Sequence, residues 1–159
     1  MNLFRILSLM KKDDEYRTRE KFLTKLAGRE YLSEEEVNEL FSYKHLEYHA
    51  NPDARKITQK AFASSDLGEK FRLLRRLNGV GVIMTSTILM FQNPNRYAEL
   101  NPVCWNSLIR NFGFKASEKD GRSDYGIPEY TTYLEAIKSI ADEYGMKIGE
   151  VEYVLSHSE

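Results

Sequence analysis

The stretch Gly79-Val80-Gly81 constrains the fold more than any other part of the chain, because apolar segments flank it on both sides. Two glycines one residue apart allow φ > 0 where a side chain would clash. A largely apolar run, 82–91, follows them. Apolar residues at helical spacing precede them, namely Leu67, Phe71, Leu74 and Leu77. The pattern predicts a hairpin, in which two helices are joined by a tight turn.

The second helix of this hairpin would begin with unpaired backbone amides that carry partial positive charge, a combination that suits a phosphate group. Residues 51–122 hold twelve Lys/Arg and six Asp/Glu, whereas the rest of the chain holds eleven and eighteen. The hairpin therefore lies in the basic middle of an otherwise acidic chain, which favours a phosphate-binding face. The alternative interpretation is that these lysines and arginines only solvate helix surfaces.

The remaining pattern indicates an all-α fold of about nine helices in one domain of 159 residues. No alternating run of strand type is present. The start signals are a capping box at 33–36, Asn51-Pro52, Ser65 or Asp66, and Asn101-Pro102. The stop signals are Gly28, Gly113 and Gly145. The aromatic residues Trp105, Tyr130, Tyr133 and Tyr144 fall on apolar helix faces and are expected in the core or lining a cleft.

The N-terminal segment 1–10 is too short to span a bilayer and lacks a cleavage site, so an ordinary helix and no membrane association are expected. Cys104 is the single cysteine, which excludes an internal disulfide framework and makes a reducing cytoplasm the simplest setting. An apolar helical context predicts that this thiol is buried.

From residue 65 to 113 the order of elements becomes specific. A helix is followed by Leu77-Asn78-Gly79-Val80-Gly81, an apolar helix with small residues, a turn containing Pro94, and a polar residue opening a Trp/Leu helix. This order resembles the helix-hairpin-helix superfamily of DNA glycosylases, with the motif at about 66–91. The resemblance implies a two-lobed helical domain that binds double-stranded DNA, and it allows for a monovalent cation held by hairpin carbonyls.

Members of that superfamily typically carry a catalytic aspartate after the hairpin helix, and some carry a lysine just after the second glycine. Aligned without a gap, the lysine position is Ile83 and the aspartate position is Asn101. Isoleucine cannot form a Schiff base, and asparagine carries no charge to stabilise a cationic sugar. Asn101 is expected to cap a helix, and standard glycosylase or lyase chemistry is not expected. Glu99 is the nearest carboxylate.

The segment Lys44 to Tyr48 follows a predicted helix and is a candidate for lining the cleft between lobes. His45 and His49, four residues apart, could share a metal ion if residues 45–49 were helical, but two surface histidines are the expected outcome and no metal site is predicted.

Two functions follow from these patterns. In the first, the hairpin binds the DNA backbone for repair or damage sensing, through Gly79, Val80, Gly81, Ile83, Arg75, Arg76 and Arg110. In the second, the fold serves as a protein-interaction or regulatory module, and the hairpin is purely structural.

Overall fold

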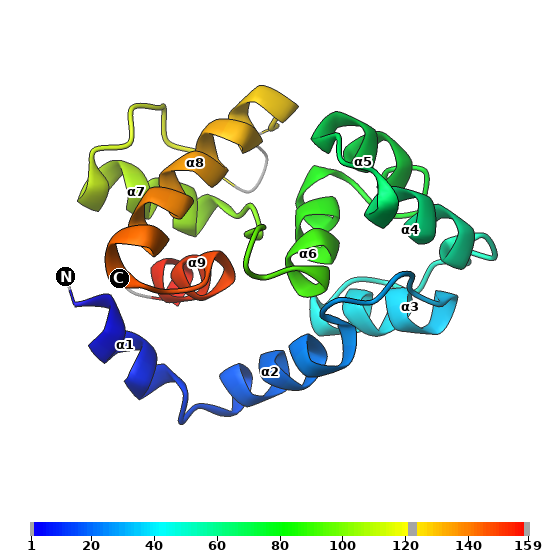
Figure 1. The fold of residues 1–159 in the computed structure, drawn as a ribbon, viewed down its shortest axis with the longest axis horizontal. Coiled ribbons are helices and arrows are strands. Elements are labelled where there is room, and N and C mark those ends of the chain that lie inside the picture. The colour runs from blue at the N-terminus through cyan, green and yellow to red at the C-terminus, as the bar shows by residue number, and fades with distance from the viewer. Residues whose placement is uncertain (1, 121–123, 158–159) are drawn as a thin grey trace.

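The computed structural model describes residues 2–120 and 124–157, and within these ranges the chain is helical without any strand (Figure 1). This confirms the expected all-α class. The helices are α1 (Leu3–Met10), α2 (Asp14–Leu26), α3 (Glu34–Tyr43), α4 (Ala54–Ala63), α5 (Leu67–Leu74), α6 (Val82–Gln92), α7 (Pro102–Phe112), α8 (Ile127–Tyr144) and α9 (Ile148–His157).

Most helix ends lie where local signals predict them. Ser33 Oγ accepts from the N–H of Glu36 at 3.1 Å and the Glu36 carboxylate accepts from the N–H of Ser33 at 3.0 Å, so the capping box of α3 is complete. Asp66, and not Ser65, caps α5 by accepting from the N–H of Glu69. The predicted stops Gly28, Gly113 and Gly145 all have positive φ.

The Asn51-Pro52 start signal is wrong in one respect, because α4 begins three residues later with Asp53 as its N-cap. The Asn51 side chain does not cap this helix. It is buried and accepts a hydrogen bond from the N–H of Asn78, in the turn between α5 and α6, at 2.6 Å. The backbone groups of a tight turn need partners, and Asn51 supplies them from a distant segment.

The helices pack in two groups on either side of α6 (Figure 1). One group joins α3 to α4, α4 to α5 and α5 to α6, and the other packs α1, α7 and α8 against α9. Helix α2 packs on α6. The first and last described helices are therefore neighbours, although they lie at opposite ends of the chain.

Helix α6 is at the centre because its sequence leaves it no solvent face. Every residue from Met84 to Phe91 is buried, and the apolar ones belong to a core cluster that extends through both helix groups. A helix that is apolar all round is stable only when surrounded by other elements. The position of its N-terminus, at the edge of the core, fixes the position of the hairpin.

Buried tyrosines of α8 hold the segment between α6 and α7. Tyr130 donates to the carbonyl of Ala98 at 2.8 Å and Tyr133 donates to the carbonyl of Glu99 at 2.7 Å. Both side chains are fully buried, as is Cys104, whose pKa is raised by burial. The predictions that these tyrosines lie in the core and that the thiol is buried are confirmed.

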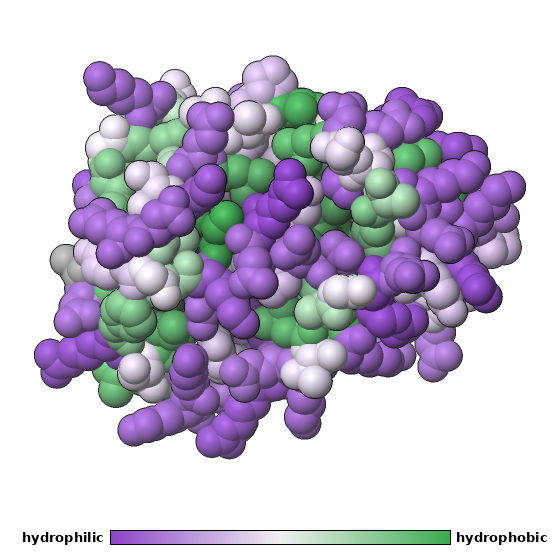
Figure 2. All heavy atoms as spheres, viewed as in Figure 1, coloured by the Kyte–Doolittle hydropathy of each residue, from purple (hydrophilic) through white to green (hydrophobic). Residues whose placement is uncertain are grey.

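The surface of the molecule is mainly hydrophilic on the face that Figure 2 shows, with hydrophobic side chains scattered among the polar ones. None of the helices in the described ranges combines the length and the apolar character that crossing a membrane requires. Segment 3–10 forms α1 as expected, and its N-cap Asn2 accepts from the N–H of Arg5.

Candidate nucleic-acid interface and adjoining cavity

The hairpin consists of α5, the turn 75–81 and α6. Gly79 has a φ of 80°, and a Cβ at this position would overlap the imidazole ring of His49. Gly81 differs from the expectation, since its φ is −101° and nothing lies within 4 Å of the place where its Cβ would be. The positive-φ prediction is therefore correct for Gly79 and wrong for Gly81. Gly81 instead leaves the start of α6 open.

Gly81 is the N-cap of α6 and offers no side chain to the amides of the first turn. The backbone N–H of Thr85 donates to the carbonyl of Gly81 at 3.0 Å, which is the first bond of the helix ladder. The N–H groups of Val82, Ile83 and Met84 precede that bond and have no intrahelical acceptor. They mark a place where the partial positive charge of the helix end meets the surface.

Two arginines flank this end of the hairpin. Arg75 and Arg76 follow α5, are exposed, and form no ion pair with any described residue. Other basic side chains of the middle segment are less available, because Arg72 pairs with Glu69. Arg110, on α7, pairs with Glu118 at 2.8 Å. The two arginines beside the turn are thus the basic groups of the hairpin that are open to an anion.

A cavity of about 690 Å³ adjoins the hairpin. Its walls combine three segments, of which the hairpin provides the largest part. The lining residues are Arg75, Gly79, Gly81, Val82, Ile83, Met84 and Thr87 of the hairpin, Lys44 and Leu46 after α3, and Asp124 and Tyr125 before α8. Four of the predicted DNA-contacting residues therefore meet at one cavity, whereas Val80 is buried and Arg76 and Arg110 are not among its lining residues.

A buried carboxylate lies behind the polar part of this cavity. Glu99 Oε1 accepts from the Thr87 hydroxyl at 2.7 Å and pairs with Lys44 Nζ at 2.5 Å. Glu99 is only 6 % exposed, so these two partners compensate for the burial of its carboxylate. Of segment 44–48, Lys44 and Leu46 line this cavity, whereas its assignment to a cleft between two lobes stays a prediction. The sequence offers no signal that would pair Lys44 with Glu99, because the two are distant along the chain.

The Glu99 backbone connects this pair to a second buried pair. Its N–H donates to Glu152 Oε1 at 3.0 Å, and Glu152 pairs with Arg19 at 3.3 Å. Burial raises the pKa of Glu152, with Arg19 opposing the shift. Burial acts to lower the pKa of Arg19, but the charges of Glu152, Tyr43 and Glu99 and the hydrogen bond to Glu152 together outweigh it and raise the pKa. A partly exposed ion pair, Lys44–Glu99, and a buried one, Arg19–Glu152, thus connect the hairpin cavity to α2.

Tyr125 is a further lining residue that no sequence pattern indicated. Its hydroxyl is buried and has no hydrogen-bond partner within the described part of the chain. Burial raises the pKa of Tyr125 to about 12, so the phenol stays neutral. The ring packs edge-on to Trp105 at a centroid distance of 5.5 Å.

The two positions expected for catalytic residues have other roles here. Asn101 Oδ1 accepts from the N–H of Cys104 at 2.7 Å and caps α7, as the Asn-Pro pattern predicts. Ile83 lines the hairpin cavity with an aliphatic side chain. Neither contributes a nucleophile or a charge.

The segment that contains His45 and His49 is not helical, so the two imidazoles do not share a helix face. His49 is half-buried, packs against Phe41 with ring centroids 5.4 Å apart, and covers Gly79. His45 is exposed and has a φ of 58°. No group of three or more metal-binding side chains occurs among the described residues.

A monovalent cation at the hairpin stays a prediction. The carbonyls of Leu77 and Asn78 already accept hydrogen bonds, from the N–H of Val80 at 3.3 Å and from Asn51 Nδ2 at 3.2 Å. Each carbonyl oxygen has a second lone pair, which is what a cation would use.

No family model matches this chain, and neither a curated protein nor a solved structure matches it.

Proposed function

We propose that this protein binds double-stranded DNA through the α5–α6 hairpin, in the manner of helix-hairpin-helix proteins of the DNA glycosylase type, and that it serves DNA repair or damage sensing. The division of the helices into two groups around α6 supports this comparison. So does the position of a cavity directly beside the hairpin.

The observation that carries the proposal is the open N-terminus of α6 next to two arginines that pair with no residue in the described ranges. Gly81 leaves space for a phosphate oxygen to approach the first amides of the helix. Arg75 lies at the same cavity and Arg76 follows it, so two cations would add to the charge of the helix end. Contacts of this kind fix position on the DNA backbone and carry no sequence information.

The cavity beside the hairpin supports recognition of distorted DNA in addition to binding of the DNA backbone. A volume of about 690 Å³ falls in the range of small-molecule sites, which is about 300–1,000 Å³. Leu46, Ile83 and Met84 provide apolar walls, and Lys44 and Thr87 provide polar groups. A nucleotide turned out of the duplex needs both. Unpaired nucleotides cost least to turn out, so the protein should prefer mismatched or bulged duplexes.

Base removal by the usual lysine or aspartate is not part of this proposal. Ile83 and Asn101 occupy the corresponding positions, and Asn101 serves as a helix cap. The proposed role is therefore binding without standard glycosylase or lyase chemistry at these two positions.

The proposal is tested by comparing Gly81→Glu with Gly81→Ala in fluorescence-anisotropy titrations of a bulged duplex. The alanine fits the space at Gly81, and so its affinity should equal that of the wild type. The glutamate side chain would place a negative charge at the phosphate position and weaken binding roughly tenfold or more, the scale of lost charge-assisted hydrogen bonds. Equal melting temperatures of the two variants would show that folding is unaffected.

Two results would contradict the proposal: equal affinity of both variants, or no duplex binding by the wild type at low salt. Either result would favour the protein-interaction module with a purely structural hairpin. The hydrogen bond between Asn51 and Asn78 and the packing of His49 against Gly79 would then serve only the stability of the fold.

A further inference from the structure

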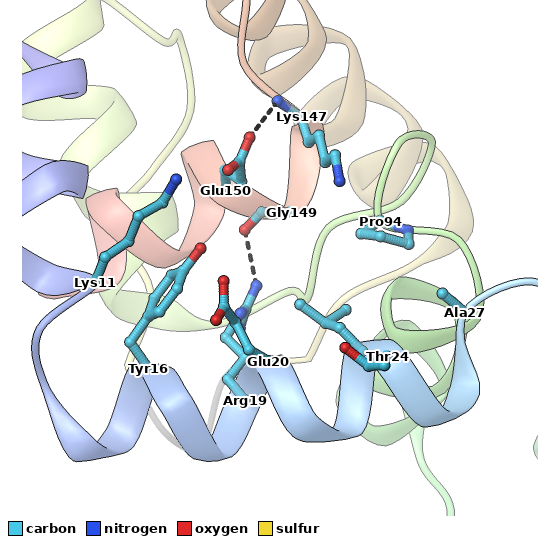
Figure 3. A pocket seen from close by; sticks show the side chains of 11 residues that line it. Lys11, Tyr16, Arg19, Glu20, Thr24, Ala27, Pro94, Lys147, Gly149 and Glu150 are labelled. Carbon is cyan, nitrogen blue, oxygen red and sulfur yellow. Dashed lines mark hydrogen bonds between the residues drawn. The ribbon is translucent and has the colours of Figure 1, made fainter.

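A second cavity lies away from the hairpin, between α2 and the start of α9 (Figure 3). Its volume is about 470 Å³. Side chains of Tyr16 and Arg19 line it from α2, and Lys147, Gly149 and Glu150 line it from the other side. None of these residues has a part in the proposed DNA contact.

Arg19 is the most informative residue of this cavity, because it is 4 % exposed and yet incompletely paired. Its Nη2 donates to the Gly149 carbonyl at 2.8 Å and to Glu152 Oε1 at 3.3 Å, and lies 3.5 Å from Met90 Sδ. No described residue accepts from Nε or Nη1. The guanidinium also lies 4.8 Å from the centre of the Tyr153 ring, which fixes its plane.

Because Arg19 lines the cavity, Nε and Nη1 are the donors left for a ligand there. The guanidinium has five N–H donors in a rigid fork, and Nη2 provides two of them. Nε and Nη1 are not fully buried, because the Tyr125 hydroxyl is the one fully buried side-chain polar atom without a partner among the described residues. An arginine side that is open to a cavity is suited to a carboxylate or phosphate. Figure 3 shows Arg19 extending from α2 toward Gly149 across the cavity.

Other groups around the cavity add positive potential. Lys11 and Lys147 line it from opposite sides, and α9, a helix of ten residues, begins beside it. Glu20 and Glu150 are the opposing carboxylates, and the Oε1 of Glu150 already accepts from the N–H of Lys147 at 2.9 Å. Three cationic and two anionic side chains therefore line the cavity.

Apolar side chains complete the lining, namely Leu23, Ala27 and Pro94. A bare inorganic ion would not use them. We infer that this cavity is a binding site for a small organic anion, a carboxylate or a phosphate monoester, whose charged group meets Arg19, Lys11 and Lys147 while its apolar body contacts Leu23 and Pro94.

The inference is tested by NMR on the ¹⁵N-labelled full chain, with benzoate and phenyl phosphate as probes. Benzamide and sodium chloride at matched concentration are the controls for the apolar body and for ionic strength. We expect at least one of the two anions to produce a saturable shift of the Arg19 Nε–H signal. A response to benzoate alone identifies a carboxylate ligand, and a response to phenyl phosphate alone identifies a phosphate monoester.

Variants at the rim keep the inference testable if Arg19 itself cannot be replaced without unfolding. Lys11→Ala/Lys147→Ala should weaken the binding of the responding anion about fivefold or more, the effect of two partly exposed charges. Lys12→Ala/Lys21→Ala removes the same charge from exposed positions outside the lining and should leave binding unchanged. The inference is overturned if neither anion shifts the signal more than benzamide does, or if both double variants bind the anion equally.

Discussion

The carboxamide of Asn51 pairs with both backbone groups of Asn78: it accepts from the N–H at 2.6 Å and donates to the carbonyl at 3.2 Å. The Asn78 side chain returns a hydrogen bond to the carbonyl of Ala50 at 2.8 Å. Ala50 and Asn51, just before α4, therefore hydrogen-bond to the hairpin turn at Asn78 and fix its position. The shape of the proposed DNA-binding element depends on residues nearly thirty positions away.

Asn51→Ala should destabilise the protein by about 1–3 kcal/mol, because it removes both hydrogen bonds between the Asn51 carboxamide and the backbone of Asn78. Urea unfolding measures this loss, and faster hydrogen exchange at the amides of Gly79 and Val80 should accompany it. Asn95→Ala, at an exposed position, is the matched control. Unchanged stability and unchanged exchange in Asn51→Ala would show that these hydrogen bonds are dispensable.

The two glycines of the hairpin should respond differently to the same substitution. Gly79→Ala places a Cβ against His49 on a backbone with positive φ, and should cost about 1–3 kcal/mol. Gly81→Ala meets open space at an ordinary φ and should be nearly neutral. In the double variant His49→Ala/Gly79→Ala, removal of the imidazole should restore part of the loss. Equal effects of the two alanines would contradict the described turn geometry.

Removing only the positive charge of the Lys44–Glu99 pair should destabilise the protein more than removing both charges. Lys44→Met leaves the Glu99 carboxylate without its cation and should cost about 1–3 kcal/mol, less than the 3–5 kcal/mol of a fully buried pair because Lys44 is partly exposed. Lys44→Met/Glu99→Gln removes both charges and should recover most of that loss. Urea titrations measure the free energy of unfolding of both variants. A lower value for the double variant than for Lys44→Met would contradict a stabilising Lys44–Glu99 pair.

Glu36 should give the stability a pH dependence of known sign. Burial acts to raise the pKa of Glu36, but hydrogen bonds from the Ser33 backbone and from Arg29 outweigh it and lower the pKa. Its ionised form therefore stabilises the folded state above the ordinary glutamate pKa of about 4.3, and this contribution is lost as the pH falls through the lowered value.

The variant Glu36→Gln measures that contribution, since glutamine keeps the shape of the capping box but not the charge. At pH 7 it should be less stable than the wild type by about 1–3 kcal/mol, mainly through the bidentate contact with Arg29. The difference should shrink as unfolding is measured at successively lower pH. A difference that stays constant down to the acid limit would contradict the assigned pKa direction.

The sequence predicts features that depend on neighbouring residues and misses those that depend on distant ones. The capping box at Ser33, the cap at Asn101 and the glycine stops follow from local chemistry, and all are present. The same local rule predicts a helix start at Asn51, but the Asn51 side chain hydrogen-bonds to Asn78, in the turn between α5 and α6.

Local sequence rules do not predict the ion pairs at the two cavities, for the same reason. Lys44 meets Glu99 only because α3 and the segment before α7 come together around α6, and Arg19 meets Glu152 from a separation of 133 residues. Periodicity identifies which helix faces are apolar, yet it does not say which buried charges will be paired.

The salt dependence of DNA binding tests the central claim most directly. We expect Arg75→Glu/Arg76→Glu to weaken duplex binding at least tenfold at low salt and to reduce the slope of log K against log salt by about 2, because two phosphate contacts are lost. Lys12→Glu/Lys21→Glu makes the same change of charge at exposed positions outside the hairpin and should leave the slope nearly as it is in the wild type. Equal slopes for the two double variants would contradict DNA binding through the hairpin.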